Sequence, residues 1–189
     1  METDGPGVTT LIAGAGCPLN CRWCINKRLL REASPEQVSA EELIERAAVD
    51  DLYFQASGGG VTFGGGEPLL HAPFLRRFRE LCPPEWHICA ETSLAVSEEL
   101  IRTALEAVDE FIVDCKDLDP DVYHNYTGGD ENLMESNLRL LLETAGPKRV
   151  LVRVPYIPEF NSECTPTKNA GILRSFGVTR LNLFDYVIR

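Results

Sequence analysis

The feature that most constrains the fold of this chain is a regular alternation of short apolar segments with segments of helical periodicity. Six segments are rich in apolar and β-branched residues, as buried strands are, and lie at residues 9–14, 60–63, 87–91, 110–115, 149–154 and 180–184. Five segments of helical period separate them, at residues 39–55, 72–81, 97–107, 130–144 and 166–175. Strands joined by helical crossovers lie parallel. The alternation therefore predicts an α/β fold, either a doubly wound sheet or a barrel.

Five of the predicted strands end at residues that commonly bind ligands or take part in catalysis. In a barrel, such side chains collect at the carboxyl ends of successive strands, which favours the barrel over the doubly wound sheet. Because six strands are fewer than the eight of a closed barrel, we expect an open, partial (β/α)6 barrel, formed by a single domain over residues 1–189. The residues at the strand ends are Cys17, Gly64 to Glu67, Glu91, Asp114 with Lys116, and Arg153.

Charge and hydropathy argue against several classes of function. The 189 residues include 18 basic and 29 acidic side chains, and the net charge of −11 is opposite to what binding to a phosphate backbone requires. No apolar run approaches the roughly 20 residues of a membrane-spanning helix, and the first residues lack the basic and apolar segments of a signal peptide. We therefore expect a cytoplasmic monomer that binds neither nucleic acid nor a membrane.

Three of the seven cysteines lie in one short segment, "GCPLNCRWCIN", residues 16–26. An odd number of cysteines without an export signal argues against a disulfide framework. Structural zinc usually takes four ligands, and here there is no second cysteine pair and no pair of histidines at ligand spacing. A [4Fe-4S] cluster held by three thiolates keeps one iron open for the amine and carboxylate of a ligand. Cys17, Cys21 and Cys24 are therefore the predicted cluster ligands.

The rest of this segment and the other cysteines have simpler interpretations. Pro18 stiffens the loop, and Trp23 is available to shield a cluster from solvent. Free cysteine packs as a small hydrophobe. We expect the cysteines outside the segment to be buried or incidental thiols, and these are Cys82, Cys89, Cys115 and Cys164.

A glycine-rich stretch, "VTFGGGEPLL" at residues 61–70, follows the second predicted strand and precedes a helix. Such a stretch can be an ordinary turn between a strand and a helix, as in any α/β fold. Alternatively, its glycines let the backbone approach a ligand closely, and Glu67 together with exposed amides can hold an ammonium group.

Together these two motifs resemble the radical S-adenosylmethionine enzymes. The spacing C-x-x-x-C-x-x-C with an aromatic residue before the last cysteine is the signature of that superfamily, and Trp23 occupies the aromatic position. In the family the turn after the second strand holds the amino group of the cofactor's methionine, and Gly65, Gly66, Glu67 and Pro68 match that turn. The resemblance implies two cofactors, a [4Fe-4S] cluster and S-adenosylmethionine.

A finer resemblance is to the activating enzymes of glycyl radical enzymes, of the pyruvate formate-lyase activating enzyme type. The segments that carry it are "DGPG" (4–7), "ASGGGVTFGGGEPLL" (56–70), "DCKDLDPDVYHNYTG" (114–128) and "VLVRVPYIPEFN" (150–161). The resemblance implies that Asp114, Lys116 and Arg153 hold the methionine end of the cofactor, with Lys116 and Arg153 as catalytic residues; each taken alone is equally consistent with a surface ion pair. Glu91-Thr92 falls where the family more often has Asp-Thr, and we expect both residues at the cofactor.

The chain departs from this family in several places. Ile25-Asn26 follows the last cysteine of the motif, where the family often has His-Asn, and the arginine usual after "DGPG" is replaced around Val8-Thr9. Residues 25–63 contain no cysteine, whereas most of these activators have a cysteine-rich insert there, so we expect one cluster. The chain ends at "LFDYVIR", where longer members continue to a histidine and a closing helix.

The resemblance implies a radical S-adenosylmethionine activase. Such an enzyme cleaves S-adenosylmethionine reductively and abstracts hydrogen from a backbone glycine of a partner glycyl radical enzyme, with flavodoxin or ferredoxin as the electron donor. Residues 117–132 are expected to be either part of the docking surface or a solvated loop. Two alternatives stay open: a radical S-adenosylmethionine enzyme that acts on a small molecule or peptide, and a noncatalytic iron-sulfur cluster protein.

Overall fold

A single parallel sheet of six strands forms the centre of the fold. The structure, a computed structural model, describes residues 4–32 and 34–186. The predicted strands are all present, each within two residues of its expected ends. They are β1 (Thr9–Gly14), β2 (Gly60–Gly65), β3 (His87–Thr92), β4 (Glu110–Asp114), β5 (Val150–Tyr156) and β6 (Arg180–Asp185).

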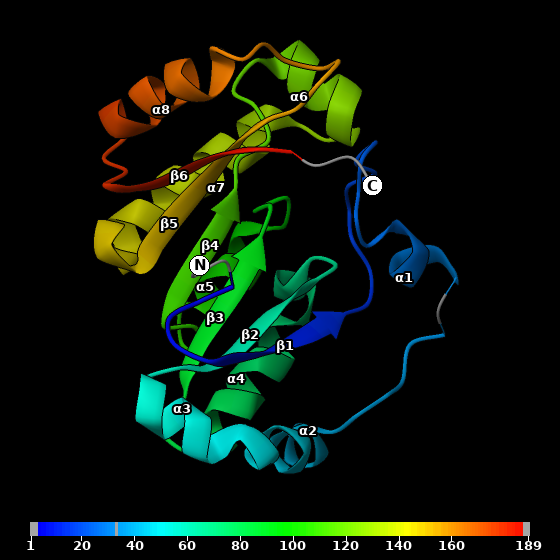
Figure 1. Ribbon diagram of the computed structural model, residues 1–189, viewed down its shortest axis with the longest axis vertical. Helices are drawn as coiled ribbons and strands as arrows, with labels where there is room; N and C mark the ends of the chain where they lie inside the picture. Colours follow the sequence, from blue (N-terminus) through cyan, green and yellow to red (C-terminus); the bar gives the residue numbers. More distant parts are fainter. Residues whose placement is uncertain (1–3, 33, 187–189) are drawn as a thin grey trace.

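The order of the strands decides between the two predicted architectures. Each strand pairs in parallel with the next one along the chain, in the order β1-β2-β3-β4-β5-β6. A doubly wound sheet reverses its order at a switch point, whereas a barrel does not. Within the described residues β1 and β6 lie at the two edges of the sheet and do not pair with each other (Figure 1). The predicted open, partial (β/α)6 barrel is thereby confirmed.

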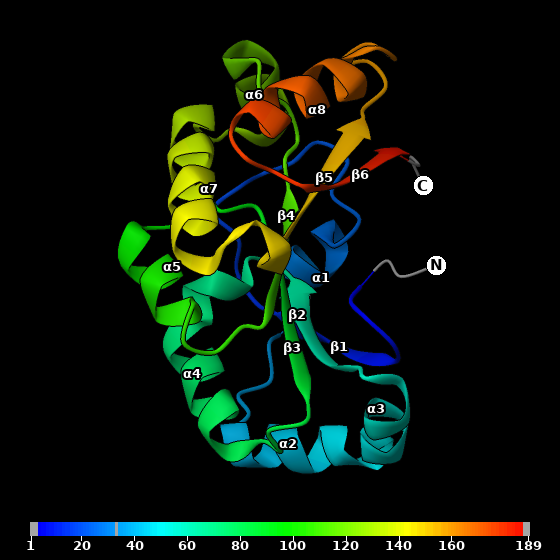
Figure 2. The same ribbon diagram turned by 90° about the vertical axis from the view of Figure 1, so that its left-hand side faces the viewer.

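The helices lie mainly on one face of the sheet. Figure 2 shows α4, α5 and α7 on one side of the strands and the N-terminal segment on the other. Among the described residues, no helix is both long and apolar enough to cross a bilayer. The helices are α1 (Lys27–Glu32), α2 (Ala40–Ala47), α3 (Asp51–Ser57), α4 (Ala72–Leu81), α5 (Glu98–Ala104), α6 (Pro120–Thr127), α7 (Glu131–Ala145) and α8 (Thr165–Ser175), with short 3-10 turns η1 (Ala48–Asp50), η2 (Pro68–His71) and η3 (Pro147–Arg149).

The predicted helix over residues 39–55 is wrong in one respect, because the chain forms two helices there with η1 between them. The break falls at two acidic residues that are bonded to other elements. The hydroxyl of Thr10 in β1 donates to Asp50 at 2.6 Å, and the indole N–H of Trp86 donates to Asp51 at 2.7 Å. Helical periodicity alone does not report such contacts.

Two helices were not predicted. The segment expected as a loop or docking surface contains α6, which begins after Asp119 and ends before Gly128. The Asp119 carboxylate accepts from the backbone N–H groups of Asp121 and Val122, Pro120 occupies the first turn, and Gly128 ends the helix with a φ of 73°. The other is α1, a short helix directly after the cysteine segment.

The core lies between the sheet and its helices. Its part near α3 and the beginning of β3 is a cluster of aromatic side chains. Phe54 and Phe78 pack on either side of Trp86, with ring centroids 5.1 and 6.3 Å away, and Phe63 packs edge-on against Phe78 at 5.2 Å. All four side chains are buried. Aromatic contacts of this geometry add to the hydrophobic stabilisation of burial.

The face of the sheet opposite α4, α5 and α7 is concave, and the N-terminal segment covers part of it. Gly5 is buried, and a Cβ built on it would lie 3.0 Å from the sulfur of Cys89. The hydroxyl of Thr62 donates to the main-chain oxygen of Asp4. The upper part of the concave face, at the carboxyl ends of the strands, carries the charged residues described below.

Removing one aromatic ring from the cluster tests this account of the core. We expect Phe78→Ala to lower the free energy of unfolding by about 3–5 kcal/mol, because it leaves a cavity among rigid neighbours. The matched control is Leu52→Ala on α3, where the side chain is 75% exposed and the expected loss is below about 0.5 kcal/mol. Urea denaturation measures both, and equal losses would contradict the assignment of the core.

Candidate functional site

The three predicted cluster ligands lie in a loop, residues 15–26, that connects β1 to α1; we call it the cysteine loop. The turn after β2, residues 65–67, holds the beginning of this loop; we call it the glycine turn. The backbone N–H of Gly66 donates to the oxygen of Gly14 at 3.1 Å, and that of Glu67 donates to the oxygen of Gly16 at 2.9 Å. The two predicted motifs are therefore bonded to each other through their main chains.

Two side chains add to this connection, and sequence reasoning missed the role of both. The amide of Asn26, at the far end of the cysteine loop, donates to the main-chain oxygen of Gly65 at 2.8 Å. The ring of His71 in η2 bonds through Nε2 to the oxygen of Ala15 at 2.8 Å. Both ends of the cysteine loop are thus attached to the segment that contains the glycine turn.

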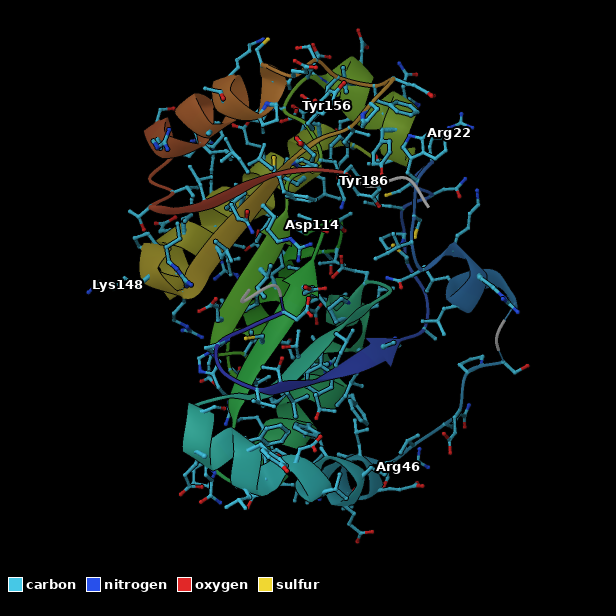
Figure 3. The ribbon with its side chains drawn as sticks, in the orientation of Figure 1. Arg22, Arg46, Asp114, Lys148, Tyr156 and Tyr186 are labelled. Atoms are coloured by element: carbon cyan, nitrogen blue, oxygen red, sulfur yellow. The ribbon has the colours of Figure 1, made fainter. Side chains whose placement is uncertain are left out.

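The middle of the cysteine loop is held from the opposite side by the unpredicted helix α6. The backbone N–H of Asn20 donates to the oxygen of Thr127 at 2.8 Å, and that of Arg22 donates to the oxygen of Tyr126 at 3.0 Å. These two bonds flank Cys21. The Arg22 side chain extends from the outer side of the loop (Figure 3).

The three thiols of the loop are partly buried. Burial raises the pKa of Cys17, and it raises the pKa of Cys21 to about 11 although Lys116 acts in the opposite direction. Within residues 4–32 and 34–186, no three His, Cys, Asp or Glu side chains converge as they would around a single metal ion. A cubane cluster binds each thiolate at a different iron and does not need such convergence. Outside the loop, Cys82, Cys89 and Cys115 are buried and Cys164 is exposed.

Unpaired donors beside the loop fit a group rich in sulfur. The indole N–H of Trp23 and the hydroxyl of Tyr123 are buried and have no hydrogen-bond partner among the described residues. Leaving a buried donor unpaired costs about 1–3 kcal/mol. Sulfide and thiolate sulfurs of an iron-sulfur cluster would accept from such donors. The residues present therefore fit the predicted [4Fe-4S] cluster.

Trp23 itself is fixed at the edge of the loop. Its ring packs edge-on against Phe160, with centroids 6.4 Å apart, and its main-chain oxygen accepts from the hydroxyl of Tyr186 at 2.5 Å. The role of Trp23 as a shield for the cluster stays a prediction.

The glycines of the turn are required by the cysteine loop. Gly65 has a φ of 82°, a conformation that L side chains rarely adopt. A Cβ built on Gly66 would lie 2.1 Å from the main-chain oxygen of Gly16. The sequence suggested glycines that admit a ligand, whereas the structure shows that Gly66 admits the backbone next to Cys17.

The side chain of Glu67 is turned into the protein. Its carboxylate is buried and accepts four hydrogen bonds, from the N–H of Leu69 at 3.2 Å, the hydroxyl of Thr92 at 2.7 Å, and the N–H and hydroxyl of Ser93 at 2.8 and 2.6 Å. Burial raises its pKa although these donors act in the opposite direction. The predicted cofactor residues Glu67 and Thr92 thus bond to each other.

The remaining predicted site residues form one network of alternating charge. Lys116 pairs with Asp114 at 2.7 Å, Asp114 pairs with Arg153 at 3.3 Å, and Arg153 pairs with Glu91 at 2.8 Å. Their side chains are only 12–27% exposed. Asp114 lies at the carboxyl end of β4 (Figure 3), while Cys115 packs in the core on the other side. We call these four residues the charge network.

The charge network shifts the pKa of its members. Burial would raise the pKa of Asp114, but Lys116 and Arg153 outweigh burial and hold it below its ordinary value. Burial raises the pKa of Glu91 to about 7; Asp114 and Asp4 add to the increase and Arg153 opposes it. Asp114 is therefore ionised at neutral pH, whereas Glu91 is close to its midpoint.

A family model confirms what the two motifs indicated. The model of the radical SAM superfamily matches residues 11–166, most of the chain. The chain belongs to the radical SAM superfamily. The cofactors of this superfamily, a [4Fe-4S] cluster and S-adenosylmethionine, are therefore the cofactors of this chain.

Curated radical SAM relatives match nearly the whole chain. Pyruvate formate-lyase-activating enzyme of Clostridium pasteurianum is 31% identical, over 97% of this chain and 77% of the relative. The (2S)-3-sulfopropanediol dehydratase activating enzyme of Klebsiella oxytoca is 27% identical, over 97% of this chain and 78% of the relative. The finer resemblance to activating enzymes is confirmed.

Solved structures of radical SAM proteins share the fold. Streptococcus suis SuiB bound to S-adenosylmethionine superposes with a TM-score of 0.71 at 15% identity, over 97% of this chain. The protein anSMEcpe with bound AdoMet superposes with a TM-score of 0.70 at 17% identity, over 95% of this chain. The chain spans 41% of the length of SuiB and 51% of that of anSMEcpe, so these structures support the fold alone.

Adding one methyl group at Gly66 tests the contact between the glycine turn and the cysteine loop. We expect Gly66→Ala to lower both the iron bound per chain and the affinity for S-adenosylmethionine, because the new Cβ displaces the oxygen of Gly16. The matched control is Gly171→Ala in α8, where a Cβ meets nothing within 4 Å and both values should be unchanged. Iron analysis and calorimetry measure them. Normal iron content in Gly66→Ala would contradict the proposed contact.

The pKa of Glu91 tests the charge network. We expect a carboxyl titration near pH 7, and in Arg153→Gln a higher midpoint, because Arg153 is the neighbour that favours the ionised form. Carbon-13 NMR of glutamate side chains measures the midpoint, and Glu91→Gln identifies the resonance. A midpoint near the ordinary value of about 4.3 in the unaltered protein would show that Glu91 is not buried in this network.

Proposed function

We propose that this chain is a radical SAM activase that abstracts hydrogen from a backbone glycine of a partner glycyl radical enzyme. The observation that carries the proposal is the match of activating enzymes over 97% of the chain, in two relatives with different partner enzymes in their names. The charge network supports it from the geometry, since it brings together both signs of charge, as the binding of a zwitterionic amino acid requires.

In our proposal, different residues of the chain hold the two cofactors. Cys17, Cys21 and Cys24 would hold three irons and leave the fourth open for the amine and carboxylate of S-adenosylmethionine. When bound, the reduced cluster supplies one electron to cleave S-adenosylmethionine, and the carbon radical that results takes a hydrogen atom from the substrate.

The methionine end of S-adenosylmethionine carries one positive and one negative charge. In our proposal the main chain of the glycine turn and the carboxylates of Asp114 and Glu91 face its ammonium group. Lys116 and Arg153 then face its carboxylate, as charge-assisted partners. Thr92 acts through Glu67, whose carboxylate it helps to hold.

The open sheet supports a protein substrate. Because β1 and β6 do not pair within the described residues, the concave face is not enclosed by strands, and a loop of a partner protein could approach it. We propose that the partner is a glycyl radical enzyme and that the electron donor is a flavodoxin or a ferredoxin.

One specific observation favours a second candidate, a radical SAM enzyme that acts on a peptide. SuiB and anSMEcpe share the fold, and structures of these proteins are described with a precursor peptide and with the Kp18Cys peptide. Their identity to this chain is 14–17%, below that of the activating enzymes.

A deuterium-transfer experiment separates these functions. The anaerobically reconstituted protein is given S-adenosylmethionine, a reductant and glycyl radical enzymes whose glycines are deuterated at Cα. Deuterium in 5′-deoxyadenosine is expected for the activase. Production of 5′-deoxyadenosine without deuterium from any such enzyme would favour the peptide or small-molecule alternative. Absence of 5′-deoxyadenosine would leave only a noncatalytic cluster protein.

Lys116→Ala tests the charge network as the binding site for the methionine end. A charge-assisted contact contributes roughly 1.5–3 kcal/mol, so we expect the dissociation constant of S-adenosylmethionine to rise about tenfold to hundredfold. The matched control is Lys148→Ala in η3, whose exposed side chain lies far from the cysteine loop (Figure 3) and whose loss should have no effect. Calorimetry measures both, and equal affinities in the two variants would exclude Lys116 from the site.

A further inference from the structure

Tyr123 on α6 has a buried hydroxyl group that no described residue satisfies. The side chain is 0% exposed, and its oxygen has no hydrogen-bond partner in residues 4–32 and 34–186. Buried hydroxyls in proteins are nearly always hydrogen-bonded. Tyr123 is an exception, as are Trp23, His87 and Tyr126 among the described residues, and its place beside the cysteine loop points to a partner that does not belong to the polypeptide.

Tyr123 lies next to the point where α6 holds the cysteine loop. The hydroxyl of Thr127 donates to the main-chain oxygen of Tyr123 at 2.7 Å, and the oxygen of Thr127 in turn accepts from Asn20 of the loop. A Cβ built on Gly129 would lie 2.5 Å from the Leu19 side chain and 3.2 Å from the Tyr123 ring. The Tyr123 ring therefore packs beside Leu19 of the cysteine loop. It lies one helical turn before Thr127, whose main-chain oxygen holds the backbone next to Cys21.

The charges that act on the hydroxyl agree with this placement beside the cysteine loop. Burial raises the pKa of Tyr123 most, and the charges of Cys21, Cys115, Glu67 and Glu131 raise it further, in that order. The Glu67 carboxylate already accepts four hydrogen bonds, and the sulfur of Cys115 is directed at the main-chain oxygen of Asp117, 4.0 Å away. Among the described residues none of these groups lies within hydrogen-bond distance of the hydroxyl, and the one with the largest effect, Cys21, is a predicted cluster ligand.

We propose that the Tyr123 hydroxyl donates a hydrogen bond to a sulfur atom at the Cys21 corner of the cluster and thereby raises the reduction potential of the cluster. The proposal rests on the proposed function, because it needs a cluster on the cysteine loop. Hydrogen bonds to cluster sulfurs stabilise the additional negative charge of the reduced form. In this arrangement the Tyr123 hydroxyl is the hydrogen-bond donor, and its bond makes the cluster accept an electron more readily.

Removing the hydroxyl alone provides the test. In Tyr123→Phe the ring that fills the core is kept, and the cluster potential should become more negative, while the iron bound per chain and the affinity for S-adenosylmethionine stay as in the unaltered protein. Potentiometric titration of the reconstituted holoprotein, followed by electron paramagnetic resonance, measures the potential. The matched control is Tyr53→Phe on α3, where the side chain is 60% exposed and the potential should not change.

A second replacement tests the same bond in the opposite direction. Incorporation of 3-fluorotyrosine at position 123 makes the hydroxyl a stronger donor and should shift the potential to a more positive value. An unchanged potential in Tyr123→Phe with a full cluster refutes the inference and leaves the proposed function intact. If Tyr123→Phe loses iron, the fluorotyrosine protein decides, and a potential equal to that of the unaltered protein refutes the inference. An unaltered protein that binds no iron refutes both.

Discussion

Two main-chain hydrogen bonds from the glycine turn, one to Gly14 at the end of β1 and one to Gly16 in the cysteine loop, fix the site to the sheet. They join the end of β1 to the end of β2, which already lie side by side as paired strands. They are possible because Gly66 has no Cβ to meet the oxygen of Gly16. The position of the thiols is therefore set by strand register, the most rigid part of an α/β fold, and α6 then holds the loop from its other side.

The charge network complements this rigid frame because its charges cancel. Two acidic and two basic side chains alternate, at or just after the ends of β3 and β4 and in the middle of β5, and each is mostly withdrawn from solvent. An unpaired charge in such a place would be costly, whereas paired charges satisfy each other. In the binding mode that we propose, a zwitterion would exchange partner for partner with the network and leave no charge unpaired.

The sequence predicted those parts of the structure that depend on local pattern. Strand positions follow from buried β-branched segments, and their carboxyl ends locate Cys17, Asp114 and Arg153 without knowledge of tertiary contacts. The break before α3 depends on contacts with β1 and Trp86, which periodicity does not encode. The inward turn of the Glu67 carboxylate likewise depends on donors some 25 residues away, in β3 and the segment after it. The capping signal at Asp119 was present but lay in a segment too polar to suggest a helix.

The contacts that hold the cysteine loop also determine when, during synthesis of the chain, the loop can reach its final conformation. Its backbone partners lie far ahead in the chain, at residues 65–67 and at residues 126–127. A ribosome makes the chain from its N-terminus, so the three thiols are synthesised before either set of backbone partners. Contacts between distant segments form late because loop closure must precede them. The cysteine loop therefore reaches its final conformation only after β2 and α6 have formed on either side of it.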